Sequence, residues 1–568
     1  MEFFQCLCPV AGRVILDGND QGPNKDSDGN LKTFLCNAGL HTISLQCPDG
    51  KKCSPRQVTI EIKDTDPILP LQVAFKCRKP RKRLKHLAVV VAMIIAGCAH
   101  YPDNPRLDAI SPDAGYRYSV VRNQPSSDRP FVLLAFSGGG TRAAAFSFGL
   151  MEQLRRVEYT SPGGSKRRLL DDVEIISSVS GGSFTSAYYA LFPERFFSDF
   201  PDRFLKRNIQ QGLLVRMFNP YNWIRLASPD FSRIDMADEY YTNTVFEGKT
   251  FADLLKKPKG SVPFLVLNAT NISIAHRFEF TQDQFDLLCS DLSGVALSRA
   301  VAASSNFPVA FAPLTVDIYK EGCGPLPVWV ELGLDREKNP KRRVSEASAA
   351  RSYRDPDRLF AHLLDGGISD NLGLRGPFQA VTTTDSAWSI LKAANLGQLG
   401  RLMVIAVNAK TTKQRTWDAK SSPPGIGAVL DVVMNGPMDD VSYDSLEMTD
   451  GHFKQMKQLA RTVDSCNKRL ARDCPHAPQI ANPITTDFTF AELTFDDIPD
   501  PRLRQCLQGL PTSFSLPEKT IELLRMAAGH LLMTSDNFVA AMKRLDPSWQ
   551  PLQVVIEAKL IDEVCGEK

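Results

Sequence analysis

The sequence predicts an α/β protein in which a mainly parallel sheet lies between two layers of helices, preceded by a small β-sandwich. Apolar runs of strand length lead directly into helical patterns: residues 131–136 precede the pattern of residues 143–156, and residues 175–179 precede residues 184–189. Alternation of strands and helices favours a parallel sheet that is covered on both faces. Residues 1–75 instead hold short alternating runs between Gly, Asn, Asp and Pro turns, which favours a separate sandwich.

The composition is that of an ordinary globular enzyme. The chain has 568 residues, of which 43% are hydrophobic and 23% charged, and this suits a large core and two or three domains. A formal net charge of +3 is too small to indicate nucleic acid as a partner. Heptads, a solenoid period and long low-complexity runs are absent from the sequence, which excludes coiled-coil and repeat architectures.

Ser180 stands at the apex of a predicted strand–turn–helix. The apolar run of residues 175–179 ends there, and a helical pattern follows. Such an elbow strains the serine backbone and needs small neighbours, because other parts of the chain pass close to it. Ser178, Gly181 and Gly182 meet this need, although the elbow motif usually has glycine where this chain has Ser178. The pattern predicts a nucleophilic serine, and a turn made of small residues for packing is the alternative.

Three glycines, Gly138, Gly139 and Gly140, connect a predicted strand to a predicted helix. Backbone N–H groups and the positive end of the helix dipole converge at such a turn, which suits an oxyanion. Arg142, at the start of the helix, can hold the loop or add positive potential. A dinucleotide-binding turn is the rival interpretation, and Ala143 in the last glycine position does not exclude it. The next strand ends in serines instead of the acid that a ribose contact needs, so we favour the oxyanion hole.

Asp365 lies between an apolar run and the turn formed by Gly366 and Gly367. A carboxylate at the end of a strand is held rigidly, and the glycines beside it leave it accessible. A serine hydroxyl needs a neighbour that takes its proton, and a carboxylate within hydrogen-bond reach can do so in place of histidine. The alternative for this segment by itself is an ordinary Asp-Gly turn.

A histidine-based triad is the competing arrangement, since most serine hydrolases use one. The chain has 8 His, and the order serine, acid, histidine would nominate His452, His476 or His530. None of the three ends a strand-like run, and the surroundings of His452 and His530 are typical of helices. His362 precedes Asp365 by three residues and is expected to be a packed or surface ring. We therefore favour a serine–aspartate pair.

In their order, Gly-Gly-Gly-Thr-Arg, Ser-x-Ser-Gly-Gly and Asp-Gly-Gly resemble the patatin-like phospholipase family. Residues 264–271 and 296–308 are similar to family segments between the serine and the aspartate, and residues 510–517 are similar to a stretch of bacterial members. The resemblance covers roughly residues 125–545, and the ordered combination is far more specific than any one motif.

The resemblance implies a lipid acyl hydrolase with a three-layer patatin-like fold. It assigns Ser180 as the nucleophile, Asp365 as the base and the glycines 138–140 to the oxyanion hole. Two positions depart from the family pattern: Ser178 replaces the leading glycine of the elbow, and Ala143 replaces the glycine that usually follows the arginine. Both substituents are small, and neither change removes a reacting group.

A basic run, residues 76–86, is followed at once by the apolar run of residues 87–98. This layout is typical of a secretory signal, and Ile95-Ala96-Gly97-Cys98 resembles the lipobox of bacterial lipoproteins. The apolar run is shorter than the ~20 residues of a spanning helix, which favours a signal over a permanent anchor. The resemblance to the lipobox implies lipidation at Cys98 and attachment to a bacterial envelope, and Ala99 is compatible with onward sorting to the outer membrane. An internal anchor and a buried strand are the alternatives.

The expected organisation has five parts. Residues 1–75 form the small β domain, which resembles PEGA-type surface domains and is expected to bind a protein partner. Residues 76–99 hold the basic flank and the signal or anchor, and residues 100–125 form a linker. The acyl hydrolase domain spans residues 126–545, and residues 546–568 form a C-terminal tail.

The cysteines favour an oxidising compartment over a metal site. Of 13 Cys, six precede Cys98 and six follow it, and even counts suit disulfides. Zinc is disfavoured, because no Cys-x-x-Cys pair faces a second pair. We expect neither a metal nor an organic cofactor.

Two further segments are expected to lie near the surface. Residues 192–250 interleave aromatic and basic side chains, which is compatible with an amphipathic helix that lies on a bilayer and lifts to admit a lipid. Apolar periodicity alone does not separate this interpretation from core packing. Residues 322–357 are rich in charge and proline, and we expect a solvated insertion there.

The sequence thus predicts a membrane-associated acyl hydrolase of the phospholipase A or lysophospholipase type. Its substrate would be a phospholipid or another acyl-ester lipid at a membrane surface. A non-catalytic envelope protein that keeps the fold for lipid binding or scaffolding is the alternative, and it has no need of a serine and a carboxylate in contact. The head group, sn position and chain length do not follow from the sequence.

Overall fold

A computed structural model describes residues 1–78 and 104–566, except residues 49–50, 124–125, 127, 308–310, 322–323, 383–398, 413–415, 420, 422–423 and 483–485. The predicted signal and Cys98 therefore lie outside the described residues. The chain divides into two compact units, Met1–Cys98 and Ala99–Lys568. Among the described residues, helices long and apolar enough to cross a membrane are absent.

The N-terminal unit consists of short strands around one core. One sheet has the order β4-β1-β8, a second has the order β3-β2-β5-β7, and β6 pairs with β9. Both larger sheets send apolar side chains into the same cluster, which includes Phe4, Val14, Ile43 and Val73. A disulfide joins Cys47 to Cys77. The alternating runs of residues 1–75 form strands, whereas a sandwich or PEGA-type fold for this unit stays a prediction.

The strands of the N-terminal unit have the following bounds: β1 Glu2–Leu7, β2 Arg13–Leu16, β3 Asn19–Pro23, β4 Thr33–Cys36, β5 Gly39–Gln46, β6 Lys52–Ser54, β7 Val58–Ile62, β8 Leu71–Ala74 and β9 Lys76–Arg78.

The second unit is formed around an eight-stranded sheet of order β16-β17-β14-β13-β10-β18-β19, with β15 paired to β14. The strands β14, β13, β10, β18 and β19 run parallel to one another. The strands β15 and β17 run antiparallel to β14, and β16 runs antiparallel to β17. The predicted mainly parallel sheet is confirmed. Its strands are β10 Phe131–Phe136, β13 Val173–Val179, β14 Phe264–Asn271, β15 His276–Glu279, β16 Leu314–Asp317, β17 Phe360–Asp365, β18 Arg401–Asn408 and β19 Asp487–Thr494.

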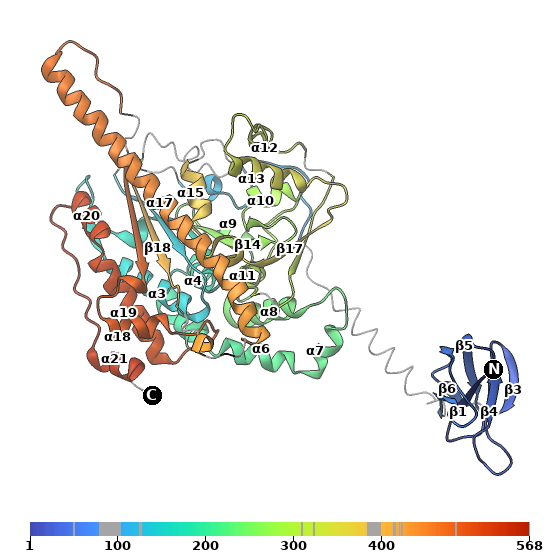
Figure 1. Cartoon of the computed structure of the whole chain (residues 1–568). Helices are drawn as coiled ribbons and strands as arrows, with labels where there is room; N and C mark the ends of the chain where they lie inside the picture. The colour runs from blue at the N-terminus through green and yellow to red at the C-terminus, as the bar shows by residue number, and fades with distance from the viewer. Residues whose placement is uncertain are drawn as a thin grey trace. The chain divides into compact units, whose positions relative to one another are not determined.

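Helices cover both faces of the sheet. Every residue of β10, β13 and β14 is buried, although successive side chains in a strand point to opposite faces. In Figure 1 the long helix α17 crosses one side of this unit, and its far end projects beyond the sheet. Helices α3, α4 and α19 pack against one another or against the central strands. The carboxyl ends of β10 and β13 lead directly into α3 and α4, so the two loops lie at the same sheet edge.

The α-helices have the following bounds: α2 Tyr118–Val121, α3 Gly140–Arg156, α4 Gly181–Leu191, α5 Phe196–Phe200, α6 Ile209–Met217, α7 Pro220–Arg225, α8 Arg233–Tyr241, α9 Phe251–Leu255, α10 Gln282–Leu287, α11 Leu297–Ser304, α12 Val328–Gly333, α13 Lys341–Ser352, α14 Gly367–Asp370, α15 Arg375–Thr382, α17 Ile426–Asp473, α18 Pro501–Gln508, α19 Glu518–Thr534, α20 Asp536–Leu545 and α21 Ala558–Cys565. A small hairpin, β11 Glu158–Thr160 and β12 Lys166–Arg168, follows α3.

One expectation about a surface segment needs correction, and one open alternative is decided in part. The solvated insertion expected at residues 322–357 holds the helices α12 and α13, whose side chains Val330 and Ala347 are fully buried. Charged residues share these helices with an apolar face, so composition alone misplaced them. Among residues 192–250, Phe196, Phe200 and Phe204 are also fully buried, so the core interpretation is right for that part.

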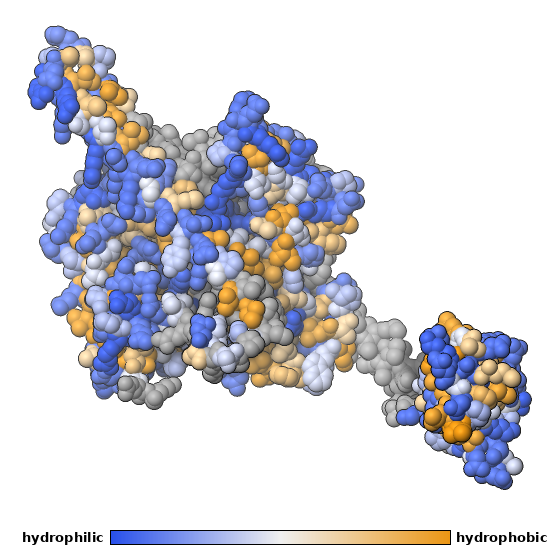
Figure 2. Space-filling model, viewed as in Figure 1, coloured by the Kyte–Doolittle hydropathy of each residue, from blue (hydrophilic) through white to orange (hydrophobic). Residues whose placement is uncertain are grey.

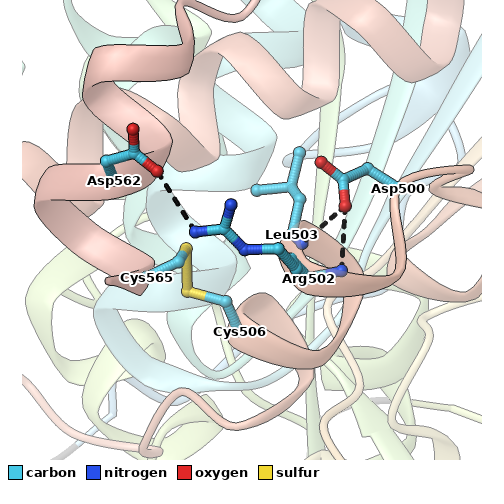
Figure 3. Close-up of a disulfide and its surroundings, with 6 residues drawn as sticks. All are labelled: Asp500, Arg502, Leu503, Cys506, Asp562 and Cys565. Carbon is cyan, nitrogen blue, oxygen red and sulfur yellow. Dashed lines mark hydrogen bonds and ion pairs between the residues drawn. A yellow bond between two sulfur atoms is a disulfide. The ribbon is translucent and has the colours of Figure 1, made fainter. Parts of the chain in front are cut away.

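The C-terminal residues are attached to the second unit. A disulfide joins Cys506 of α18 to Cys565 of α21, across a sequence separation of 59 residues (Figure 3). Beside it, the guanidinium of Arg502 lies 3.1 Å from the carboxylate of Asp562, and Leu560 is buried in the main core.

Candidate active site

Ser180 occupies a strained turn between β13 and α4. Its φ of 50° and ψ of −118° lie outside the regions that L-residues ordinarily adopt. The turn also requires glycine next to it, because a Cβ on Gly181 would lie 2.0 Å from the carbonyl oxygen of Gly140. The predicted elbow is therefore present as backbone geometry, and the side chain of Ser180 stands at the end of a central strand.

The small residues around the elbow are explained by close contacts. A Cβ on Gly182 would lie 2.6 Å from the Cβ of Phe136, so only glycine fits there without movement. Ser178 replaces the usual glycine, and its hydroxyl is paired with that of Ser186 at 2.6 Å. A hydroxyl in this buried position is tolerated because it has a hydrogen-bond partner.

Asp365 is the last residue of β17, and its carboxylate lies beside Ser180. The hydroxyl of Ser180 hydrogen-bonds to this carboxylate, and the N–H of Gly367 donates to Oδ1 over 2.8 Å. Burial raises the pKa of Asp365 to about 6, against the opposing effect of these two hydrogen bonds. A base whose pKa lies just below neutrality is ionised at pH 7 and still accepts a proton readily.

The two glycines after Asp365 are fixed by their surroundings. A Cβ on Gly366 would lie 2.3 Å from the carbonyl oxygen of Asn268, and one on Gly367 would lie 2.5 Å from Cε of Met438. These contacts let the Asp-Gly-Gly turn pack between β14 and α17, which holds the carboxylate at a fixed place.

Ser304 and Asn306, at the end of α11, connect the serine to the aspartate. The N–H of Ser180 donates to Oγ of Ser304 over 3.0 Å, and the N–H of Gly366 donates to the Ser304 carbonyl over 3.2 Å. The N–H of Asp365 donates to the Asn306 carbonyl over 2.9 Å. The sequence pattern of residues 296–308 assigns no role to any of them by itself. The signal was available in the consecutive polar residues that end an otherwise apolar helix.

The glycine loop adjoins both catalytic candidates. The N–H of Gly138 donates to the carbonyl of Asn371 over 3.0 Å, which ties the loop to the chain that follows the Asp-Gly-Gly turn. Gly139 caps α3 with a φ of 138°, a conformation that favours glycine. Among the described residues, the N–H groups of Gly139 and Gly140 have no hydrogen-bond acceptor. These two donors are free for an oxyanion, whereas that of Gly138 is occupied.

Arg142 holds the glycine loop in place. Its guanidinium donates to the carbonyls of Ala409 and Leu510, over 2.9 Å and 3.0 Å, and to Oγ1 of Thr512 over 3.2 Å. Burial lowers the pKa of Arg142 to about 10, so it stays protonated at neutral pH. The side chain faces oxygen dipoles, and within the described chain it has no carboxylate partner. It therefore adds positive potential next to the loop.

The described histidines do not hydrogen-bond to Ser180 or Asp365. His362 lies three residues before Asp365 on β17, so the two side chains point to opposite faces of the sheet. On its own face, Nδ1 of His362 lies 3.3 Å from Oγ1 of Thr315. His452 of α17 packs against Phe378 of α15, and Nδ1 of His530 lies 3.1 Å from the carbonyl oxygen of Val554. His476 is exposed. Across the described ranges, groups of His, Cys, Asp and Glu that could hold a metal ion are likewise absent.

Residues 134–377 match the model of the patatin-like phospholipase family. The chain carries a patatin-like phospholipase domain. The matched range contains the glycine loop, Ser180 and Asp365, so the three predicted segments all fall inside this domain. At the level of the family, this is a lipid hydrolase domain with a patatin-like α/β fold.

Solved structures are also similar to this chain at low identity. Human GIVD cytosolic phospholipase A2 aligns at 10% identity with a TM-score of 0.38, over 94% of this chain and 79% of that one. VipD from Legionella pneumophila aligns at 10% identity with a TM-score of 0.24, over 70% of this chain and 67% of that one. Likeness at this level supports no inference about activity. No curated protein matches the sequence.

Proposed function

We propose that the chain hydrolyses the carboxylic ester bonds of phospholipids, as a phospholipase A or lysophospholipase, with Ser180 as nucleophile and Asp365 as base. The hydrogen bond between these two side chains supports this assignment most directly, together with a pKa of about 6 at Asp365. A serine with a carboxylate base needs no metal or organic cofactor for acyl transfer.

In the first half-reaction, Oγ of Ser180 attacks the ester carbonyl while Asp365 accepts its proton. The carbonyl oxygen becomes an oxyanion, and the N–H groups of Gly139 and Gly140 are the donors proposed to bind it. The ester bond then breaks, the lipid alkoxide takes the proton from Asp365, and the acyl group stays on Ser180.

In the second half-reaction, Asp365 accepts a proton from water, and the hydroxide attacks the acyl-enzyme. The bond between the acyl carbon and Oγ of Ser180 breaks, the fatty acid leaves, and Oγ recovers its proton from Asp365. Arg142 contributes by fixing the glycine loop and by its positive charge. It is a positioning residue in this scheme, because its guanidinium is occupied by backbone carbonyls and a threonine.

The test combines covalent labelling with turnover. Wild type, Ser180→Ala and Asp365→Asn are incubated with a fluorophosphonate probe and assayed on a fluorogenic acyl ester and on mixed phospholipid vesicles. We expect labelling of wild type at Ser180, none of Ser180→Ala, and loss of hydrolysis in both variants with unchanged circular dichroism. A folded wild type that never labels at Ser180 would overturn the enzymatic proposal.

The same proposal includes attachment to a bacterial envelope through Cys98. The basic run of residues 76–86 and the lipobox-like residues 95–98 support it. The disulfide between Cys506 and Cys565 is compatible with an oxidising compartment for the hydrolase unit. Cell fractionation of Cys98→Ser tests the attachment: the variant should leave the membrane fraction. If it stays there with unchanged mobility, the apolar run is an uncleaved anchor.

A further inference from the structure

Five large apolar side chains stand exposed on the helices α6 and α7 and the turn between them. We call them the tip surface: Leu214, Val215, Phe218, Tyr221 and Trp223. Each is at least 43% exposed, and all five fall within ten residues of sequence. In Figure 2 the edge of the unit where Figure 1 places α6 and α7 carries apolar residues between hydrophilic ones. Several large apolar side chains exposed on one short segment indicate an interaction surface.

The opposite faces of the same helices pack against the rest of the unit, so each helix has one buried face and one exposed face. Ile209 and Leu213 of α6 belong to the main core, and α6 lies so close to α8 that a Cβ on Gly212 would be 2.1 Å from the hydroxyl of Tyr240. Met217 and Leu226 pack into a separate small cluster with Phe231 and Met236. The tip surface is therefore presented on a supported pair of helices.

Three N–H donors of the tip have acceptors within the tip itself. The indole N–H of Trp223 donates to the carbonyl of Met217 over 2.8 Å, and Nδ2 of Asn222 donates to the carbonyl of Arg216 over the same distance. The side chain of Asn219 accepts from the N–H of Tyr221. Since the indole hydrogen bond does not depend on water, the indole ring of Trp223 can enter an apolar medium without leaving its N–H unpaired, and the hydroxyl of Tyr221 suits the polar head-group region.

The charged residues around the tip surface favour an anionic binding partner. From Arg203 to Pro229 the sequence has five cations and no carboxylate. Acids from outside this stretch pair with three of them, Arg203, Lys206 and Arg225. Within the described chain, Arg207 and Arg216 have no carboxylate partner, and Arg216 lies over the ring of Tyr240 at 4.4 Å. Aromatic rings flanked by unpaired arginines match a bilayer with anionic head groups.

A short path of hydrogen bonds connects α6 to the glycine loop. The N–H of Ile209 donates to the carbonyl of Phe514 over 3.1 Å, and the N–H of Thr141 donates to the carbonyl of Ser513 over 2.9 Å. Phe514 also packs edge-on against Phe184 of the elbow helix, with ring centroids 5.8 Å apart. The tip and the proposed oxyanion site are thus joined to the same two consecutive residues.

We infer that the tip surface inserts into the head-group region of an anionic lipid bilayer and holds the glycine loop near that surface. This inference rests on the proposed function, because the bilayer is taken to carry the substrate. It names the element that contacts lipid, which lies outside the reacting groups and apart from Cys98.

The insertion test uses the full chain with Ser180→Ala as background, so that hydrolysis cannot alter the vesicles. Vesicles contain phosphatidylcholine with 30% phosphatidylglycerol and brominated acyl chains, which quench tryptophan on contact. We expect quenching that is largely lost on adding Trp223→Phe, which keeps the apolar ring but removes this reporter. Equal quenching with and without Trp223 would overturn the inference, and so would equal quenching by vesicles of phosphatidylcholine alone.

The functional arm uses the active chain and separates docking from chemistry. Phe218→Ser with Trp223→Ser should lower the rate on anionic vesicles at least tenfold and leave the rate on a monomeric short-chain ester unchanged. Val328→Ser with Leu332→Ser removes two exposed apolar side chains elsewhere and is the matched control. An equal loss of rate on both substrates would overturn the inference. A wild type that hydrolyses neither substrate, but whose Trp223 is still quenched by anionic vesicles, would overturn the proposed function alone. A concentration-dependent shift of Trp223 emission without lipid would assign the surface to a second copy of the chain.

Discussion

The backbone N–H of Ser180 donates a hydrogen bond to the hydroxyl of Ser304, over 3.0 Å. Ser304 also contacts Oγ of Ser183 at 2.8 Å, and its carbonyl accepts from Gly366, the residue after Asp365. One side chain and one carbonyl of α11 therefore fix the strained elbow and the Asp-Gly-Gly turn relative to each other. The strain at Ser180 persists because this network over-determines its backbone.

Ser304→Ala should therefore lower kcat with little change in KM. Loss of one hydrogen bond to the elbow corresponds to about 0.5–1.5 kcal/mol, or roughly a 2–13-fold lower rate if it is felt in the transition state. Steady-state kinetics on a monomeric ester measure this effect. Ser305→Ala is the control, since the Ser305 hydroxyl donates to the carbonyl of Val301 within the helix. A larger effect at Ser305 than at Ser304 would contradict the positioning role.

The activity should fall as the pH drops through about 6. Asp365 acts as a base only when ionised, and its pKa is raised from 3.8 to about 6 by burial. We expect kcat/KM to decrease with a slope of one proton below that pH and to level off above it. The rate of fluorophosphonate labelling should follow the same curve, because it reports the serine directly. A curve that flattens in His362→Gln would instead implicate the histidine.

Asp365→Asn should abolish activity and stabilise the fold at alkaline pH. Because the folded pKa lies above the unfolded value, the unfolded chain loses its proton first, and stability falls as the pH rises from about 4 to about 6. At pH 8 the neutral amide removes this cost, which corresponds to about 1–3 kcal/mol. Thermal unfolding of both proteins at pH 4 and pH 8 measures it, and the gain should be confined to the higher pH. A variant that is less stable than wild type at pH 8 would contradict the pKa shift.

The sequence predicted the sheet and the elbow because local physics determines them. Apolar runs buried on both faces and turns with obligatory small residues leave few alternatives, as the contact between Gly181 and Gly140 illustrates. The link from Ser304 to Gly366 could not be predicted, since it joins residues that are 62 positions apart in sequence only after the chain has folded. The hydrogen bond from the N–H of Gly138 to the carbonyl of Asn371 also joins distant parts of the chain. The sequence therefore does not distinguish Gly138 from the two glycines whose N–H groups are free within the described chain.

Charge composition is a poor guide to burial where helices are amphipathic. Residues 328–352 have a high density of charged side chains, yet Val330, Ala347 and Ala350 form a buried face. The aromatic residues after the elbow divide in the same way, with Phe200 and Phe204 in the core and Phe218 and Trp223 exposed. Periodicity reports that a helix has two faces, and only the tertiary structure shows which neighbours cover each face.

Gly139→Ala should reduce kcat about 100-fold or more with a much smaller change in KM. A methyl group would force residue 139 out of its φ of 138°, and its Cβ would lie 2.9 Å from Nη2 of Arg142. Both effects displace the N–H groups proposed to bind the oxyanion, a loss felt mainly in the transition state. Gly163→Ala, at an exposed turn with open space, is the control. An unchanged kcat with a raised KM would make the loop a substrate-docking element.

Replacing Cys506 and Cys565 by alanine should destabilise the hydrolase unit and slow turnover. The disulfide closes a loop of about 60 residues, for which chain entropy corresponds to about 4 kcal/mol of stability. Helix α18 leads directly into Leu510 and Ser513, which accept hydrogen bonds from Arg142 and Thr141 (Figure 3 shows the disulfide end of this helix). Loosening α18 should therefore disturb the glycine loop as well. Thermal unfolding with and without reductant, together with kcat, measures both effects. Cys466→Ala with Cys474→Ala, which removes two exposed free thiols, should change neither. If reductant leaves the unfolding of wild type unchanged, the disulfide does not support this end of the site.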